Sequence, residues 1–182
     1  MIICICGKTG SGKSTLALKI KEKHPEAIYV DVDLIAHQVL NYDEVKSKII
    51  ELFGDNILEN SQINRKKLGK IVFNNKEKMQ LLMDITWKYM EKDIDDILMK
   101  NTGRIIILDY IFLPITKYFK ESKIRILLDI PKEIREKRIL KRDNISKEEF
   151  ELRDNSCVLY KEHEFNHILK NNNDIMNLIK IV

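Results

Sequence analysis

Glycine, proline and cysteine are all scarce in this chain of 182 residues, which contains six, three and three of them. The three cysteines, Cys4, Cys6 and Cys157, are too few for a disulfide framework, and no CxxC pair supplies the spacing of a zinc site. Linkers rich in proline or serine and internal repeats are also missing, so we expect a single domain over residues 1–182. The cysteine usage suits a reducing compartment, and we expect the protein in the cytoplasm.

Long apolar runs and a strong charge of one sign are missing as well. No run reaches the roughly 18 residues of a membrane-spanning helix, and residues 1–6 lack the basic start of a signal peptide. Lys and Arg number 32 against 28 Asp and Glu, which leaves a net charge of +4. This small excess suits an anionic small ligand. We therefore expect no membrane and no nucleic acid as partners, and a monomer or a weak homo-oligomer.

Short apolar runs are present, and they have the length of strands. They are rich in Ile and Val, and the middle ones are nearly continuous, which is typical of strands buried on both faces of a parallel sheet. Helical segments lie between them, and this β-then-α order predicts a doubly wound α/β fold with a five-stranded parallel sheet. The expected strands are residues 2–6, 27–32, 104–108, 124–130 and 166–169.

One connection in this pattern is too long. About 70 residues separate the second and third strands, far more than a βαβ crossover needs. A helical lobe inserted at residues 34–102 accounts for them. Its main helix is predicted by apolar residues that recur at i, i+3, i+4 and i+7, namely Met79, Leu82, Met83, Thr86, Met90, Ile94 and Ile97.

A second helical region is expected at residues 131–160. Pro131 suits the first position of its first helix, 131–142. Ser146 and Glu149 have the spacing of a capping box that opens another helix. We expect these helices to form a lid. The run 171–173, three asparagines, is expected to be a turn near the C-terminus.

Half of the glycines lie together, in GKTGSGKS at residues 7–14. This string matches GxxxxGK[ST] between a strand and a helix, the context of a phosphate-binding P-loop, whereas the simpler interpretation is a glycine-rich turn. Backbone N–H groups of such a loop and the following helix N-terminus bind phosphate oxygens. Lys13 is expected at the β- and γ-phosphates and Ser14 at Mg²⁺. The other expected nucleotide-binding residues are Gly7, Gly10, Ser11, Gly12 and Thr15.

Aspartates end two of the expected strands. Asp31 and Asp33 close the second, and strand alternation puts both on one side with Asp33 nearer the loop. Ligands in open α/β sheets bind beyond the carboxyl ends of strands. Asp33 could therefore accept a proton from an acceptor hydroxyl or help to hold Mg²⁺, unless both are simply solvated turn residues. Asp109 ends the third strand in the position of a Walker-B aspartate and is expected to bind Mg²⁺.

Three arginines, Arg135, Arg138 and Arg142, recur at i, i+3 and i+7 along the helix that Pro131 opens. Charged helix faces are often merely solvated. Here the helix follows a strand on the nucleotide side, so arginines on a lid could neutralise charge on a transferring phosphoryl group. We expect Arg138 and Arg142 to take part in catalysis.

Taken together, these motifs resemble the dephospho-coenzyme A kinase family, the last enzymes of coenzyme A biosynthesis. The matching segments are collinear and span nearly the whole chain: residues 7–15, 30–40, 53–54, 63–73, 129–131, 138–143 and 166–172. The resemblance implies an ATP- and Mg²⁺-dependent kinase that phosphorylates the 3′-hydroxyl of dephospho-CoA. It implies Asp33 as the group that orients or deprotonates this hydroxyl, Thr9 and Arg65 at the acceptor, and Asn171 at the nucleotide.

Two differences from the family pattern concern the acceptor side. Thr86-Trp87 stands where the family carries His-Pro, and residues 111–114 lack the family's acid. A nucleoside or nucleotide kinase of the same superfamily is therefore an alternative. A second alternative is a nucleotide-binding module without acceptor chemistry, although the Asn-Lys-x-Asp and DxxG motifs of a GTPase are missing.

Overall fold

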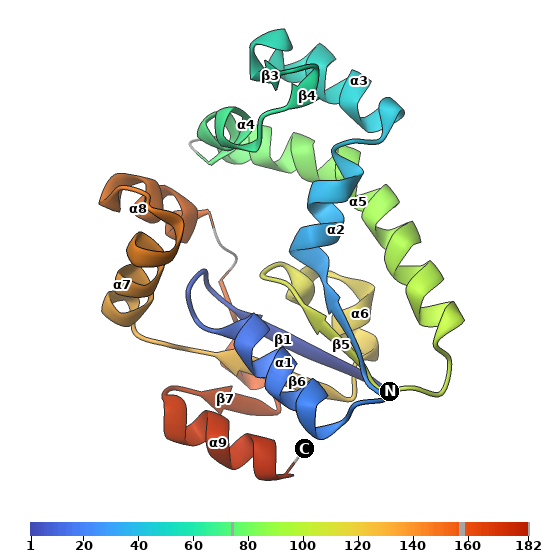
Figure 1. Cartoon of the computed structure of the whole chain (residues 1–182), viewed down its shortest axis with the longest axis vertical. Coiled ribbons are helices and arrows are strands. Elements are labelled where there is room, and N and C mark those ends of the chain that lie inside the picture. Colours follow the sequence, from blue (N-terminus) through green and yellow to red (C-terminus); the bar gives the residue numbers. More distant parts are fainter. Residues whose placement is uncertain (74, 157–158, 182) are drawn as a thin grey trace. The chain divides into compact units, whose positions relative to one another are not determined.

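The computed structural model describes residues 1–73, 75–156 and 159–181. The chain divides into two compact units. The sheet unit comprises Met1–Asp31 and Asn101–Val182, and the helical unit comprises Val32–Lys100. Figure 1 traces the path of the chain through both units, and each is described by itself below. Cys157 lies outside the described residues.

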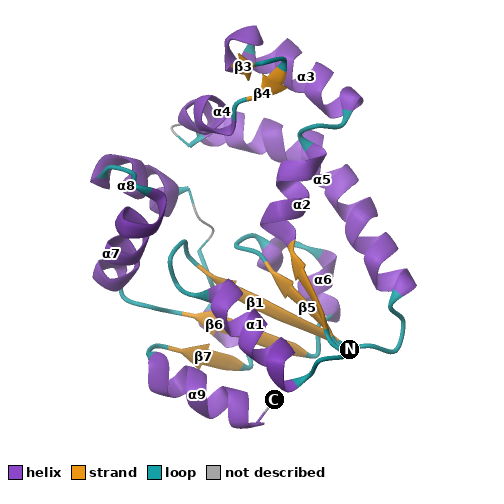
Figure 2. Cartoon of the chain, viewed as in Figure 1, coloured by secondary structure: helices purple, strands orange, loops and turns teal. Residues whose placement is uncertain are grey.

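Five parallel strands form the sheet, in the order β2-β5-β1-β6-β7 (Figure 2). They are β1 (Ile2–Gly7), β2 (Ile28–Asp31), β5 (Ile106–Asp109), β6 (Ile124–Leu128) and β7 (His167–Leu169). Each matches one of the five apolar runs, so the predicted α/β fold with a five-stranded parallel sheet is confirmed. Only the ends differ, by up to two residues.

Helices cover both faces of this sheet, because side chains alternate along its central strand. Ile3 and Ile5 of β1 are fully buried and belong to one apolar cluster with Leu16 and Ile20 of α1 (Lys13–Lys23). Cys4 points the other way, and its Sγ lies 3.7 Å from the carbonyl oxygen of Tyr118. Tyr118 belongs to α6 (Lys117–Glu121), so β1 is buried from both sides, as its continuous apolar run predicts.

Parallel pairing brings the strand ends to one edge of the sheet. Ile5 of β1 pairs with Asp109, the last residue of β5. Asp31, the last residue of β2, pairs with Asp109 from the other side. Gly7, the last residue of β1, pairs with Leu128 of β6. The P-loop therefore starts at the edge where both aspartates end their strands.

The helical unit contains the single long helix that the apolar spacing predicts, α5 (Lys76–Lys100), with Thr86, Met90 and Ile94 buried. The other helices of this unit are α2 (Val32–Val39), α3 (Asp43–Phe53) and α4 (Arg65–Val72). A one-turn helix at Asp55–Ile57 and a short antiparallel pair, β3 (Leu58–Glu59) and β4 (Gln62–Ile63), connect α3 to α4.

The expected strand position of Asp33 is wrong. Strand β2 ends at Asp31, and Val32 already begins α2, so Asp33 lies exposed in the first turn of a helix. Val32, Ile35 and Val39 are buried in that helix. Their i, i+3, i+7 spacing is helical, and it outweighs the two-residue alternation of Asp31 and Asp33. A carboxylate in the first turn is also favoured by the helix dipole.

The remaining helices belong to the sheet unit. They are α7 (Lys132–Asp143), α8 (Lys147–Asn155) and α9 (Asn172–Ile181), with one-turn helices at Leu113–Ile115 and Glu162–Glu164. Pro131 is the residue that precedes α7, with ψ of 141°, and not its first helical residue. The asparagine run begins a helix and is not a turn: Asn171 Oδ1 accepts hydrogen bonds from the backbone N–H groups of Asn173 and Asp174 at the start of α9. Over the described residues, no helix combines the length and the apolar character of a membrane span.

The capping box predicted at Ser146 is present at the start of α8. Ser146 Oγ accepts the backbone N–H of Glu149 at 3.2 Å, and Glu149 Oε2 accepts the backbone N–H of Ser146 at 3.4 Å. Two N–H groups that the helix itself cannot pair are thereby satisfied.

Removing this cap should destabilise the protein slightly. We expect Ser146→Ala to cost about 1 kcal/mol and to lower Tm by about 2–4 °C in calorimetry, because Glu149 N–H loses its acceptor. Ser146→Thr keeps the hydroxyl and should stay close to wild type. An alanine variant that melts with wild-type Tm contradicts this account of the α8 terminus.

Candidate active site

The loop between β1 and α1 contains a tight turn that is closed by a backbone hydrogen bond. Ser11 N–H donates to the Lys8 carbonyl at 3.1 Å, and Gly12, in the left-handed region with φ of 97°, precedes the first residue of α1. The first N–H groups of a helix have no partner inside it, and they carry the positive end of the helix dipole. This part of the loop can therefore bind phosphate oxygens through backbone groups.

Glycine at position 10 is required by close packing. Its φ is 80°, and a Cβ there would lie 2.8 Å from the carbonyl oxygen of Arg135 and 2.8 Å from Ile139 Cγ1. Both neighbours belong to α7. The backbone of α7 therefore rests directly on the loop.

Ser14 and Asp109, the two expected metal ligands, are in contact. Asp109 is 2% exposed, and its Oδ2 accepts the hydroxyl of Ser14 at 2.7 Å and that of Tyr29 at 3.2 Å. Its other oxygen, Oδ1, is buried without a hydrogen-bond partner in the described part of the chain. Burial raises the pKa of Asp109, and Lys13 and the Ser14 hydrogen bond offset part of this rise.

This arrangement fits a magnesium ion. No group of three or more His, Cys, Asp and Glu residues that could hold a metal is found among the described residues. Mg²⁺ does not need one, since it is usually held by one or two carboxylates together with water and substrate phosphates. The unpartnered Oδ1 of Asp109 and the hydroxyl of Ser14 are oxygen ligands of the kind that Mg²⁺ prefers.

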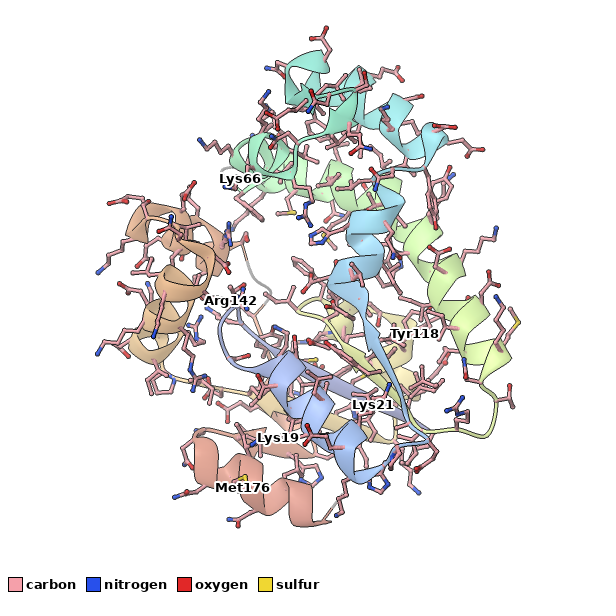
Figure 3. The ribbon with its side chains drawn as sticks, viewed as in Figure 1. Lys19, Lys21, Lys66, Tyr118, Arg142 and Met176 are labelled. Carbon is pink, nitrogen blue, oxygen red and sulfur yellow. The ribbon has the colours of Figure 1, made fainter. Side chains whose placement is uncertain are left out.

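An open pocket of about 510 Å³ lies beside the loop. Apolar side chains from two helices, Leu16 of α1 with Ile175 and Met176 of α9, form part of its wall. Lys19 and Met176, which also line the pocket, lie side by side (Figure 3), with Lys19 Nζ 3.8 Å from Met176 Sδ. The aromatic base of a nucleotide could bind here while the phosphates of the same nucleotide reach the loop. The other lining residues are Ser11, Gly12, Thr15 and Arg138.

The three arginines of α7 have three different environments. Arg135 is 5% exposed and forms a buried ion pair with Asp154 of α8, so the interpretation as a solvated helix face is wrong for it. Arg138 Nη1 donates to the carbonyls of Gly10 at 3.2 Å and Ser11 at 3.4 Å. Arg142, labelled in Figure 3, is largely exposed and forms an ion pair with Asp143. Seven residues of a helix span about 10 Å. Arg142 therefore lies well beyond the first turns of α7, which rest on the loop.

On the helical unit, Asp33 and Arg65 belong to one polar patch. His37 follows Asp33 by one helical turn on α2, and Arg65 Nη1 donates to His37 Nδ1. Asn64 caps α4 directly before Arg65, since its Oδ1 accepts the backbone N–H groups of Lys66 and Lys67. All of Asp33, His37 and Arg65 are exposed. We name them the α2–α4 patch.

Two further expected residues make contacts of another kind. Thr9 contributes its carbonyl oxygen, which accepts a hydrogen bond from Arg135 Nη1 at 3.3 Å. Asn171 uses its side chain to cap α9 and is not among the residues that line the pocket. Both remain predictions as substrate-binding or nucleotide-binding residues.

Sequence reasoning missed three participants. Tyr29 and Asp154 reach the site from other elements and carry no local signal. His37 could have been found, because Asp33 and His37 are spaced i, i+4 on a segment whose buried residues have helical spacing.

Comparison with known proteins decides between the kinds of P-loop protein that this geometry allows. A family model described as dephospho-CoA kinase matches residues 1–177. The chain belongs to the dephospho-CoA kinase family. The resemblance expected from the motifs is thus confirmed. As a member of a kinase family, the chain is an enzyme with ATP as its substrate.

Individual relatives agree with this assignment. The dephospho-CoA kinase of Carboxydothermus hydrogenoformans is 38% identical over 156 residues, which cover 81% of this chain and 73% of that protein. That of Fusobacterium nucleatum is 33% identical over 187 residues, covering 100% and 95%. A solved dephospho-CoA kinase from Campylobacter jejuni superposes with a TM-score of 0.57 at 23% identity, covering 99% of this chain and 96% of that one. This last likeness supports the fold.

The packing of α7 on the loop can be tested at Gly10. We expect Gly10→Ala to weaken ADP binding at least tenfold in calorimetry and to lower Tm, because the new Cβ would lie 2.8 Å from the carbonyl oxygen of Arg135. Gly103→Ala is the matched control: its φ is 86°, with nothing within 4 Å of the new Cβ. The control carries only the strain of a positive φ, about 1–2 kcal/mol, and should bind ADP normally. Equal ADP affinity in the two variants contradicts the packing argument.

Proposed function

We propose that this protein transfers the γ-phosphoryl group of ATP to the 3′-hydroxyl of the ribose of dephospho-CoA, which gives coenzyme A and ADP. The observation that carries the proposal is a P-loop whose Ser14 hydroxyl contacts the buried Asp109, in a chain that matches the dephospho-CoA kinase family over residues 1–177. The family names the acceptor, and the loop supplies the phosphoryl-donor site.

The loop and Lys13 bind the phosphates of ATP. Phosphoryl transfer needs little covalent chemistry from the protein and depends on positioning and on charge stabilisation. Backbone N–H groups of the loop other than that of Ser11 hold the oxygens, and Lys13 adds a positive charge at the β- and γ-phosphates. Arg138 already lies on this loop, and Arg142, further along the same helix of the proposed lid at residues 131–160, adds positive charge near the phosphates.

Ser14 and Asp109 would hold Mg²⁺ when ATP is bound. The ion supplies positive charge that offsets the negative charge of the phosphate oxygens. The buried Oδ1 of Asp109 supports this role, because a carboxylate oxygen without a partner is costly unless a cation compensates it.

The pocket beside the loop would take the adenine ring. Leu16, Ile175 and Met176 give it an apolar wall, and its lining also includes Thr15 and Arg138. Asn171, the residue directly before α9, is proposed to contact the nucleotide.

The helical unit would bind the acceptor, as proposed for a lobe at residues 34–102. Asp33 orients the 3′-hydroxyl and accepts its proton as the bond to phosphorus forms. Arg65 binds an acceptor phosphate through its planar group of N–H donors, and His37 holds the Arg65 side chain. Thr9 is proposed to contact the acceptor from the loop.

The proposal assigns the protein a small-molecule substrate and a cytoplasmic location, with neither nucleic acid nor membrane as partner, acting as a monomer or weak homo-oligomer. Cys4 and Cys6 are buried free thiols, and burial raises the pKa of Cys4 to about 12. Such thiols are unreactive and suit a reducing environment.

The acceptor is tested directly with a panel of substrates. Purified protein with ATP and Mg²⁺ is offered dephospho-CoA, nucleosides and nucleoside monophosphates, and ADP release is followed together with the mass of the product. Dephospho-CoA should be phosphorylated with the highest kcat/KM. Preferred phosphorylation of a nucleoside or nucleotide would contradict the proposed acceptor, and ATP binding without any turnover would favour a nucleotide-binding module.

Lys13→Ala tests the donor site. We expect kcat to fall on the order of 10²- to 10³-fold, because the positive charge of Lys13 at the β- and γ-phosphates is lost. Lys21→Ala is the control, an exposed lysine in the last turn of the same helix. Both variants should melt near the wild-type Tm. Normal turnover of Lys13→Ala removes the P-loop lysine from the mechanism.

Asp33→Asn tests the proposed base. The variant keeps its shape but loses charge and basicity, so kcat should fall about 10²- to 10⁴-fold while ATP affinity stays within a few-fold of wild type. Asp43→Asn, an exposed first-turn aspartate of α3, is the matched control and should be active. If Asp33→Asn instead loses Mg²⁺-dependent ATP affinity in calorimetry, Asp33 acts on the metal. Wild-type turnover on every acceptor contradicts both roles.

A further inference from the structure

A buried ion pair joins the two lid helices directly behind the P-loop. Both oxygens of Asp154 on α8 face the guanidinium of Arg135 on α7, with Asp154 Oδ1 paired to Nη1 and Oδ2 lying 3.4 Å from Nη2. The two side chains are 6% and 5% exposed. Burial by itself would raise the pKa of Asp154, but the hydrogen bond and charge of Arg135 outweigh it and lower the pKa. The pair is therefore fully charged at neutral pH.

The same pair reaches the loop by two contacts. Arg135 Nη1 donates to the carbonyl of Thr9 at 3.3 Å, in addition to its bond with Asp154. On the other side, Lys8 Nζ lies 3.7 Å from Asp154 Oδ2. Lys8 and Thr9 are consecutive residues of the P-loop, so both partners of the ion pair hold the same turn.

Folding stability does not explain why charges stand here. Replacing a buried ion pair by apolar residues of similar volume is often neutral or stabilising. The surroundings favour such a replacement, since Ile139 and Phe150 are fully buried and Arg135 lies 6.0 Å above the ring of Phe150. Hydrogen bonds of a charged group depend on its orientation, whereas apolar contacts do not. The planar guanidinium of Arg135 can donate to Asp154, the Thr9 carbonyl and the Ile130 carbonyl in one orientation only.

This orientation determines where Arg138 lies. Arg138 follows Arg135 by three residues on α7, about 4.5 Å along the helix axis. Its Nη1 contacts the carbonyls of Gly10 and Ser11. Any rotation or slide of α7 on the loop would move Arg138 relative to bound phosphates, and a misplacement of about 1 Å can cost about a hundredfold in rate.

We propose that Arg135 and Asp154 are positioning residues for phosphoryl transfer, which hold α7 on the P-loop so that Arg138 lies at the phosphates. The inference deepens the proposed function and rests on it. On this account the ion pair fixes the first turns of α7 to the P-loop, and the more exposed Arg142 lies further along the same helix.

The test replaces the charges without opening a cavity. In the double variant Arg135→Met/Asp154→Leu, we expect a Tm equal to or above that of wild type. The dissociation constant of ADP should rise about tenfold, and kcat should fall about ten- to a hundredfold, with KM for dephospho-CoA unchanged. A variant with wild-type kcat and ADP affinity overturns the proposal and leaves the pair a structural element.

A neighbouring pair provides the matched control. Lys132 Nζ and Glu151 Oε2 also join α7 to α8, at 2.6 Å, but neither makes a contact with the loop in the described structure, and both are partly exposed. Lys132→Met/Glu151→Leu should bind ADP and turn over as wild type does. An equal loss in this control would show that any weakening of the α7–α8 junction impairs the enzyme, which also overturns the proposal.

A thermodynamic cycle tests whether the pair acts through Arg138. Arg138→Ala should slow the wild-type enzyme strongly but add little to the loss in the Met/Leu variant, because Arg138 is already displaced there. Full additivity contradicts this route. If the Met/Leu variant does not fold, Arg135→Lys replaces it in the cycle, since lysine keeps the charge but lacks the planar group that meets three acceptors.

Failure of the proposed function can be told apart from failure of this inference. If wild-type protein does not phosphorylate dephospho-CoA, the proposed function falls. ADP affinity, measured by calorimetry for the two double variants, still decides whether the ion pair holds α7 on the loop.

Discussion

Strand β1, paired in parallel with β5 on one side and β6 on the other, is the constraint on which the donor site depends. This pairing places Gly7 next to Leu128 and the end of β5 next to Ile5, so the P-loop, Asp109 and the segment leading to α7 all start at one edge of the sheet. The burial of β1 on both faces fixes its register, because a shift of one residue would turn the Ile3 and Ile5 side chains away from α1. The site is therefore positioned by core packing before any ligand binds.

Two buried carboxylates on either side of the loop show how environment separates their roles. Asp109 receives hydrogen bonds only from hydroxyl groups and keeps Oδ1 without a partner in the described structure, and burial raises its pKa. Asp154 is matched by Arg135 and Lys8, and its pKa is lowered. The first carboxylate has unused capacity for a cation, whereas the second is fully compensated. Residue type alone does not distinguish them, and their partners do.

Local patterns in the sequence are sufficient to predict the sheet, the long helix α5 and the P-loop, because consecutive or regularly spaced residues determine each of them. Contacts between distant elements were not accessible in this way. The burial of Arg135 depends on Asp154, 19 residues further along on another helix, and the hydroxyl that reaches Asp109 from Tyr29 comes from 80 residues away. At Asp33 the local signal was present but misinterpreted, since the apolar spacing of Val32, Ile35 and Val39 already indicated a helix.

Thr86 and Trp87, which stand where the resemblance implies a His-Pro pair, lie in the middle of α5. Thr86 is buried, and its hydroxyl donates to the Leu82 carbonyl at 2.9 Å, inside the helix. A proline at position 87 would lack an N–H donor and would clash with the carbonyl four residues earlier, which kinks a helix. With Thr-Trp, α5 continues unbroken over 25 residues. Thr86 is thus packed inside the helical unit. The exposed polar groups proposed for the acceptor lie on the α2–α4 patch, at Asp33, His37 and Arg65, where one contact already joins two helices.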